Sequence, residues 1–326
     1  MSGTRGDWTH HALYSGLIFT ATFHGVRRIP VRLSHAIGRC GTWLAWKLMG
    51  RTTEAVVDNL RAVRPDLDRK GLERLALLTY RSYARDTIDF IQALGTPAES
   101  LRRRFSGLDP VALDRVLAPG KGAIVATAHF GNWELGGLAL SRLYGFAPTV
   151  VAMAEPSETI NRIRRSLRAD MGIRTLEVRH DLFTALEIRR LLGENRVVAL
   201  LLDRHVGRDR IAVRFLDRQA FFLRTPALLA CLSGAPLLPC FILRQPDESF
   251  RVMIADPIWV DADADRSVAI REATQSFASV LEGQVRRFPH LWYQFYSYWR
   301  AQEVAEDEPA VPAGASAPGG GVRDRT

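Results

Sequence analysis

A histidine and a glutamate five residues apart are the residues of this sequence best suited to chemistry. His129 follows the apolar run 123–128, and Glu134 opens an amphipathic stretch after Gly131 and Asn132. Five residues put two side chains on different sides of a helix and on opposite faces of a strand, so only a turn brings this pair together. Gly and Asn tolerate the backbone angles of such a turn. A carboxylate that orients an imidazole makes a general base, so the spacing predicts proton transfer.

The same two residues also fit a structural role. A histidine at a strand end can bond backbone groups, and a glutamate in the first turn of a helix is stabilised by the helix dipole. Residues 130–137 contain no Ser, Cys or Thr, so the nucleophile of a reaction would come from a substrate. The other histidines lack the spacing of a metal site, and the sequence predicts no metal.

Short apolar strands alternate with helical stretches around this pair. The predicted strands are 123–128, 149–154, 174–178, 197–202 and 237–243, and the predicted helices are 134–143, 157–171, 182–192, 226–232 and 266–287. Strands separated by helices are typical of a largely parallel sheet covered on both faces. The sequence therefore predicts an α/β fold with a central, mostly parallel or mixed sheet flanked by helices.

The N-terminal part has a different pattern, with apolar positions three and four residues apart from about residue 8 to 93. Between 28 and 44 it predicts a basic amphipathic helix, which fits either an ordinary surface or a membrane surface. The residues on its two sides are Ile29, Leu33, Ile37, Cys40 and Leu44, against Arg28, Arg32, His35 and Arg39. Trp43 and Trp46 favour the membrane. We predict a helical, membrane-associating region at 1–104, an α/β domain at 105–300 and a disordered tail at 301–326.

Composition and charge limit the function classes. The 326 residues include 44 Lys and Arg against 35 Asp and Glu, and 47% of them are apolar. These values are ordinary for a globular protein and exclude a disordered or collagen-like chain. The basic excess favours anionic partners, but no helix-turn-helix or basic-aromatic pattern points to nucleic acid. Three separated cysteines predict reduced thiols, and no run is long and apolar enough to span a bilayer.

Several sequence blocks together resemble one family of enzymes. His129 and Glu134 form a His-x4-Asp/Glu motif behind a strand led in by Gly120-Lys121-Gly122. The other blocks are Asp58-Asn59-Leu60, Arg168 ahead of Gly172, the stretch 200–208, Arg224-Thr225-Pro226-Ala227 and the stretch 234–239. Over roughly residues 10–300 these blocks resemble the lysophospholipid acyltransferase superfamily and, within it, the bacterial lipid A biosynthesis lauroyl/myristoyl acyltransferases.

The resemblance implies a glycerophosphate-acyltransferase-like fold and a function. His129 and Glu134 would be the catalytic dyad of an O-acyltransferase. The substrate-binding residues would be Asn132, Arg168, Asp203, Arg204 and Arg208. The acyl chain would pass directly from a thioester of acyl carrier protein or coenzyme A to a hydroxyl of an anionic lipid acceptor such as a lipid A precursor. No acyl-enzyme and no cofactor beyond the thioester co-substrate would be needed.

The position of Arg204 departs from the family pattern, which often has Gln after the Asp. Similar enzymes that acylate phosphatidylinositol mannosides tend to carry Arg there, so that acceptor is the alternative. A non-catalytic membrane-binding relative and a hydrolase are further alternatives. The aromatic segment 288–299 fits either a packed terminal segment or a wall for an acyl chain. The resemblance also implies a peripheral or monotopic protein on the cytoplasmic face of the inner membrane.

Overall fold

A seven-stranded sheet forms the centre of the fold. The computed structural model describes residues 16–307 apart from 108, 154–156, 179–181 and 262–263, and the strand order is β1-β9-β8-β2-β5-β3-β4. The strands are β1 Phe105–Ser106, β2 Ala123–Thr127, β3 Thr149–Ala152, β4 Arg174–Glu177, β5 Val197–Leu201, β8 Leu237–Arg244 and β9 Phe250–Ile254. Among these strands only the β8–β9 pair is antiparallel. The predicted α/β class with a mixed, mostly parallel sheet is confirmed.

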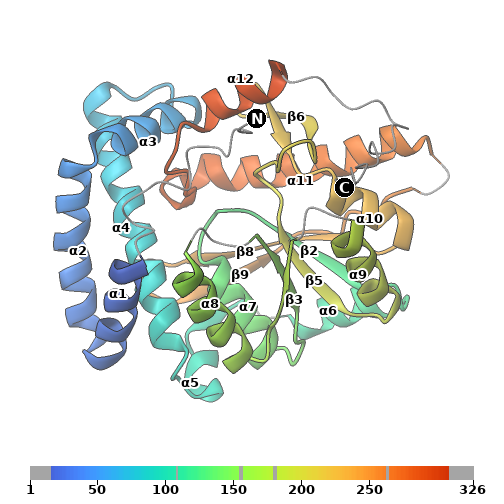
Figure 1. The fold of residues 1–326 in the computed structure, drawn as a ribbon, viewed down its shortest axis with the longest axis horizontal. Coiled ribbons are helices and arrows are strands. Elements are labelled where there is room, and N and C mark those ends of the chain that lie inside the picture. The colour runs from blue at the N-terminus through green and yellow to red at the C-terminus, as the bar shows by residue number, and fades with distance from the viewer. Residues whose placement is uncertain (1–15, 108, 154–156, 179–181, 262–263, 308–326) are drawn as a thin grey trace, which may run out of the picture.

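Helices cover both faces of this sheet (Figure 1). Successive residues of β2 face opposite sides: Ile124 packs with one group of helices and Val125 with the other. The first group is α9 Leu182–Gly193, α10 Thr225–Ser233 and α11 Arg266–Arg287, and the second includes α6 Pro110–Leu117, α7 Trp133–Arg142 and α8 Glu158–Asp170. Helix α6 was not predicted; the other five match the predicted helices to within a few residues. Burial on both faces explains why the strands read as continuous apolar runs.

The N-terminal part is helical, as predicted, within the residues that the structure describes. Its helices are α1 Gly16–Arg28, α2 Val31–Leu48, α3 Gly50–Val63, α4 Arg69–Ala93 and α5 Ala98–Arg102. Figure 1 shows α4 between α2 and the sheet. The prediction of one helix across 28–44 is wrong, because Pro30 stands at the N-cap of α2 and separates it from α1.

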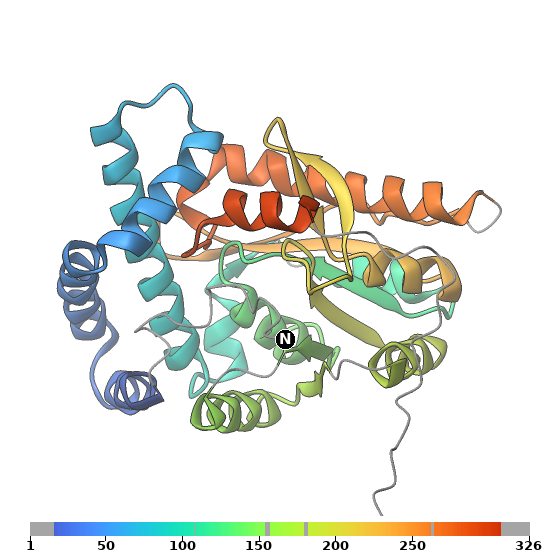
Figure 2. The ribbon, with the colours of Figure 1, turned by 45° about the horizontal axis from the view of Figure 1, so that its top comes forward.

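The helical region and the sheet share one core. Ile88 and Phe90 of α4 belong to the same buried cluster as Val125 and Ile242 of the sheet. At the other end, α12 covers Tyr298–Asp307, so the first residues of the predicted tail are helical. Residues 308–326 lie outside the described residues. Helices α11 and α12 lie on the same side of the sheet (Figure 2).

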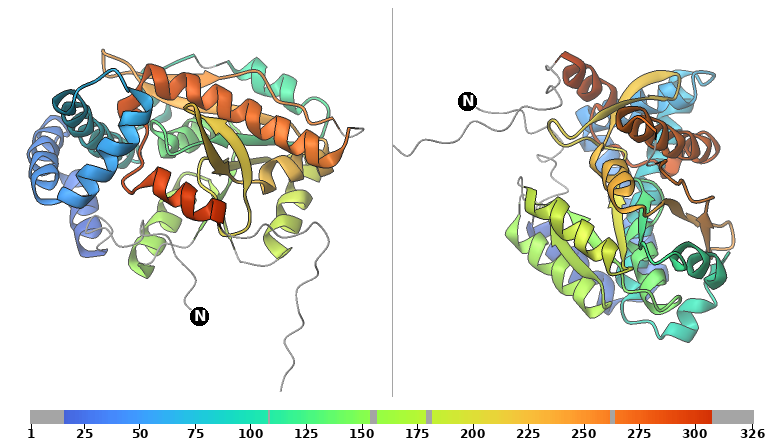
Figure 3. Two further views of the ribbon diagram at one scale, coloured as in Figure 1. Left: turned by 90° about the horizontal axis from the view of Figure 1, so that it is seen from above. Right: turned by 90° about the vertical axis from the view of Figure 1, so that its right-hand side faces the viewer.

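A separate antiparallel hairpin was not predicted. Its strands are β6 Ile211–Phe215 and β7 Arg218–Phe222, and Figure 3 shows them beside α11 and α12. Leu216 and Asp217 connect the strands with φ of 54° and 61°. Two successive positive φ angles suit a tight hairpin, but Asn-Gly is the usual signal for them, and Leu-Asp is not. The sequence therefore gives no local mark of this turn.

The pairing of β2 with β5 brings two distant parts of the chain together. The two strands are parallel, with Thr127 opposite Leu201, and the N–H of Leu202 donates to the carbonyl of Thr127. Carboxyl ends of neighbouring parallel strands meet at one edge of the sheet. Two residues beyond the last pair, His129 and Asp203 therefore stand side by side.

Gly131 turns the chain after β2 toward α7. Its φ is +62°, and a Cβ there would overlap the carbonyl oxygen of Ile242.

We expect Gly131→Ala to lower the free energy of unfolding by roughly 1–3 kcal/mol through backbone strain alone, and by more through the overlap. Gly145→Ala is the matched control, because φ is +75° there and the space around it is open. Urea unfolding measures both; an equal loss in the two variants would contradict the close approach at Gly131.

Candidate active site

His129 is held by the buried carboxylate of Asp203. Nδ1 of His129 lies 2.8 Å from Oδ1 of Asp203, and the backbone N–H of His129 donates to the same oxygen at 3.1 Å. The Asp203 side chain is fully buried, whereas that of His129 is 22% exposed. An ionised carboxylate only accepts hydrogen bonds, so Nδ1 carries the ring proton. Nε2 is then the nitrogen that can accept a proton from a substrate.

Both groups have the protonation state that a general base needs. Burial lowers the pKa of His129, and the positive charge of Arg204 lowers it further, against the opposing effect of Asp203. Burial by itself would raise the pKa of Asp203, but the interactions with His129 and Arg204 outweigh burial and lower it. At neutral pH the imidazole is therefore neutral and the carboxylate is charged.

Glu134 has a different partner from the predicted one. It lies in the first turn of α7, where its carboxylate accepts from Nη2 of Arg168 at 2.8 Å and from Nε at 3.4 Å, and lies 3.5 Å from Nη1 of Arg164. The prediction that a turn brings Glu134 to His129 is wrong, because α7 begins directly after the turn and Glu134 bonds to α8. Burial opposes ionisation of Glu134, but the two arginines lower its pKa. A chemical role for Glu134 stays a prediction.

Asn132 and Arg168 are both buried, and both bond within the protein. Asn132 caps α7, with its Oδ1 accepting from the N–H of Leu135 at 3.2 Å, while its Nδ2 donates to the carbonyl of Asp86 at 2.9 Å. Arg168 is 7% exposed and fixes Glu134. These contacts position the start of α7 beside His129. Substrate binding by Asn132 and Arg168 stays a prediction.

Asp203 has a second polar partner that sequence reasoning missed. Nε2 of Gln294 donates to Oδ2 of Asp203 at 2.7 Å. Oε1 of the same amide accepts from Nε of Arg204 at 2.9 Å, and Nη2 of Arg204 donates to the carbonyl of Tyr293 at 2.9 Å. The Arg204 guanidinium also lies 5.1 Å from the ring centre of Tyr296. Arg208 is exposed in the same loop; acceptor binding by Arg204 and Arg208 stays a prediction.

The aromatic C-terminal segment forms one side of this site. The N–H of Tyr293 donates to the carbonyl of His129 at 2.8 Å, and the N–H of Gly131 donates to the carbonyl of Leu291 at 2.9 Å. Asn59 of α3 holds the segment through bonds from its Nδ2 to the carbonyls of Gln294 and Tyr296. The only mark of this role in the sequence was the density of aromatic residues.

A pocket with a volume of about 70 Å³ opens beside the histidine. The edge of the His129 ring faces Trp133, with 5.6 Å between ring centres, and Trp133 lines the pocket. The apolar lining includes Tyr83, Phe90, Ile91, Leu167 and Tyr293, and the charged lining is Asp86, Glu134, Arg164 and Arg168. A mostly apolar lining with a few charged groups is usual for a small-molecule or lipid site.

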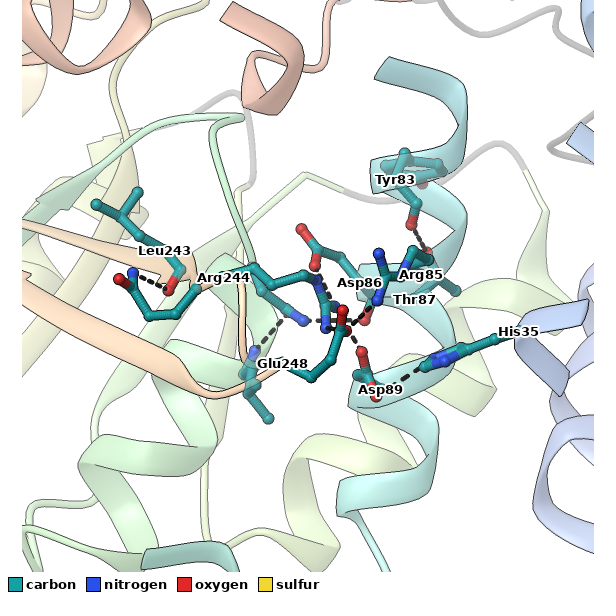
Figure 4. A network of polar contacts seen from close by, with 12 residues as sticks. His35, Tyr83, Arg85, Asp86, Thr87, Asp89, Leu243, Arg244 and Glu248 are labelled. Atoms are coloured by element: carbon teal, nitrogen blue, oxygen red, sulfur yellow. Dashed lines mark hydrogen bonds and ion pairs between the residues drawn. The ribbon is translucent and has the colours of Figure 1, made fainter. Parts of the chain in front are cut away.

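A buried charge network supports one wall of the pocket (Figure 4). The hydroxyl of Tyr293 donates to Oδ2 of Asp86 at 2.7 Å. Arg244 of β8 lies 2.7 Å from Asp86 and 2.5 Å from Asp89, both on α4. Nε2 of His35 approaches Asp89 at 3.5 Å, so this residue of α2 faces α4 rather than joining a basic surface. Burial opposes ionisation of Asp89, but His35 and Arg244 lower its pKa to about 2.

The sequence matches the bacterial lipid A biosynthesis acyltransferase family over residues 7–301. The chain belongs to this family. A phosphatidylinositol mannoside acyltransferase of Mycolicibacterium smegmatis is 26% identical over 292 residues, which cover 87% of this chain and 90% of the relative. A protein of the same name from Mycobacterium tuberculosis H37Rv is 31% identical over 209 residues, or 63% of this chain and 62% of the relative. This member of the lipid A biosynthesis acyltransferase family is therefore an acyltransferase.

The two carboxylates of this acyltransferase can be told apart by substitution. We expect Asp203→Asn to reduce kcat by about 10³- to 10⁴-fold, because an amide no longer fixes the tautomer of His129. We expect Glu134→Gln to lower the free energy of unfolding by roughly 1.5–3 kcal/mol, because the pair with the buried Arg168 loses its charge. Acyl transfer rates and melting curves of the two variants provide the measurement.

Asn132→Ala serves as the control for helix position, since it removes the cap of α7 and leaves both carboxylates in place. A variant Asp203→Asn that keeps wild-type kcat would show that His129 works without this partner. A variant Glu134→Gln that keeps its stability and loses kcat as steeply as Asp203→Asn would give Glu134 the orienting role instead.

Proposed function

We propose that this protein transfers a fatty acyl chain from a thioester to a hydroxyl of a glycolipid, with His129 as general base. The observation that carries the proposal is the His129–Asp203 pair beside the apolar pocket. Nδ1 is occupied, the imidazole is neutral, and Trp133 links its ring to the pocket wall. Family membership supports acyl transfer, and this geometry supplies a mechanism for it.

In the proposed reaction Nε2 of His129 takes the proton from the acceptor hydroxyl as its oxygen attacks the thioester carbonyl. The new C–O bond forms, the C–S bond breaks, and the imidazolium returns the proton to the leaving thiolate. Asp203 stabilises the imidazolium in between. Arg164 and Arg168 at the pocket supply positive charge for the developing oxyanion. The acyl chain passes directly between the substrates, without an acyl-enzyme.

The pocket is proposed to hold the acyl chain. Phe90, Ile91 and Leu167 give it an apolar lining, and burying a hydrocarbon chain there is favourable by about 0.8 kcal/mol for each CH₂ group. The donor is a thioester of coenzyme A or of acyl carrier protein. Either is anionic, which suits a chain with a formal charge of +9.

We propose a phosphatidylinositol-mannoside-type glycolipid as the acceptor, with a lipid A precursor as the second candidate. The names of the two mycobacterial relatives support the first, and the name of the family supports the second. Both acceptors carry phosphate, for which the exposed Arg208 at the loop after β5 is a suitable partner.

We further propose that the protein works on the cytoplasmic face of the inner membrane, with α2 against the lipid. The side of α2 that does not face α4 carries Leu33, Ile37, Trp43, Leu44 and Leu48, all at least half exposed. Arg28, Arg32 and Arg39 are exposed nearby in the sequence. Within the described part of the chain, no helix has the length and apolar character to cross a bilayer. A helix with an apolar side and basic flanks suits contact with an anionic surface.

The transfer assay combines purified protein, a donor and an acceptor, with mass spectrometry of the lipid product. We expect the mannoside acceptor to gain one acyl chain, and His129→Ala to reduce the rate to background because the base is gone. Acylation of the lipid A precursor alone would select the second acceptor. Release of free fatty acid without an acceptor would show a hydrolase, and folded His129→Ala with wild-type turnover would exclude the mechanism.

Membrane contact is tested by sedimentation with vesicles that contain anionic lipid. We expect Ile37→Ser with Trp43→Ser to lower the partition constant at least tenfold, because each buried apolar side chain is worth about 1.5–3 kcal/mol. The matched control is Val268→Ser with Trp259→Ser, which are similarly exposed elsewhere and should leave binding unchanged.

The basic residues are tested in the same assay. Replacing Arg28, Arg32 and Arg39 by Gln should weaken binding by about 1 kcal/mol for each arginine and reduce its salt dependence. Binding that is unchanged in both sets of variants would show that α2 does not meet the membrane.

A further inference from the structure

The buried amide of Gln294 lies between a charged acceptor and a charged donor. Its Nε2 donates to Oδ2 of Asp203 at 2.7 Å, and its Oε1 accepts from Nε of Arg204 at 2.9 Å. A carboxylate only accepts hydrogen bonds and a guanidinium only donates them, so the amide has a single orientation in which both bonds form. Arg204 thereby fixes which end of Gln294 faces Asp203.

We propose that Gln294 and Arg204 act together as positioning residues that hold the Asp203 carboxylate against Nδ1 of His129. The inference rests on the acyl transfer proposed above, and it assigns to Arg204 a role inside the protein in place of a contact with the acceptor. The four residues form one hydrogen-bonded series, from the imidazole through the carboxylate and the amide to the guanidinium.

The Asp203 carboxylate needs these positioning residues because a carboxylate can rotate about its terminal torsion. The terminal torsion of an aspartate has a broad energy minimum, and Oδ1 of Asp203 must stay 2.8 Å from Nδ1 of His129. The bond from Gln294 to Oδ2 fixes the plane of the carboxylate. Gln294 is itself anchored, because it is 1% exposed and its backbone carbonyl accepts from Nδ2 of Asn59 at 3.0 Å.

Arg204 also contributes its charge. The charged groups that act on His129 are Asp203 and Arg204 from the loop after β5, and Arg164 from α8. After burial, Arg204 is the main cause of the lowered pKa of His129. The second bond of the guanidinium, to the carbonyl of Tyr293, ties this charge to the segment that also bonds the backbone of His129. The charge of Arg204 and its two directed hydrogen bonds can therefore be tested separately. Arg204→Lys keeps the positive charge but loses the planar guanidinium that makes both bonds.

The test follows the titration and tautomer of His129 by NMR in protein with ¹⁵N-labelled histidine, beside the pH dependence of kcat/KM. The His129 signals are assigned by their loss in His129→Ala. The variants are Arg204→Gln, Arg204→Lys and Gln294→Leu, with Arg64→Gln as the control. Arg64 is a surface arginine that bonds Asp66, so its substitution removes one charge away from the site. A melting curve for each variant checks the fold.

We expect Arg204→Gln to raise the pKa of His129, because a nearby positive charge is lost. The acid limb of kcat/KM should move to higher pH by the same amount. Arg204→Lys should leave this limb in place and lower kcat, and Gln294→Leu should lower kcat by about 10- to 100-fold with a mixed tautomer at His129 and little change in KM. Arg64→Gln should match the wild type.

An unchanged His129 titration in Arg204→Gln, together with an unchanged tautomer in Gln294→Leu, would overturn the proposal. So would a loss in Arg204→Gln that appears only in the KM for the acceptor, since that is the sign of substrate binding. If Gln294→Leu does not fold, the two variants of the half-buried Arg204 still decide the question. The NMR readout needs no turnover, so a wild-type protein that shows the expected titration but transfers no acyl chain would refute the proposed function and leave this inference standing.

Discussion

The site depends on the burial of one charge, the carboxylate of Asp203. A buried ionised group is tolerated only where donors satisfy it, since an unpaired one would be strongly destabilising. The donors here are the backbone and ring of His129 and the amide of Gln294. His129 follows β2, Gln294 belongs to the C-terminal segment, and Asp203 itself follows β5. The requirement to satisfy one carboxylate therefore fixes the mutual positions of three distant parts of the chain.

The elements that carry the site could be predicted from the sequence, but not their order in the sheet. Both β2 and β5 read as apolar runs, with His129 and Asp203 just beyond their ends. Apolar periodicity reports burial and does not report which strand lies next to which. The short spacing between His129 and Glu134 pointed to Glu134 as the partner of the ring, because proximity along the chain is easier to see than adjacency in a sheet. The register of β2 and β5 brings Asp203, and not Glu134, into hydrogen-bond contact with the ring of His129.

Other features of the structure have weaker signals in the sequence. The hairpin turn at Leu216 and Asp217 uses residues that seldom adopt positive φ, so no turn signal was present. Gln294 is a single amide within an aromatic run, and its bonds to Asp203 and Arg204 depend on tertiary structure alone. The apolar side of α2 was visible in the sequence through its helical spacing, and the structure leaves it exposed. Contact of that side with the membrane is part of the proposed function.

The place of Gln294 in the chain has a consequence for biosynthesis. Gln294, whose amide satisfies the second oxygen of Asp203, is synthesised 91 residues after Asp203. Asn59, which anchors Gln294, is synthesised 235 residues before Gln294. Domains fold as units during synthesis on the ribosome. A nascent chain can pair β2 with β5 early, yet it holds an incompletely satisfied carboxylate until Gln294, which follows α11, has emerged. The geometry of this site therefore forms only after Gln294 has been made, and a ribosome that stops short of the aromatic segment releases a product without it.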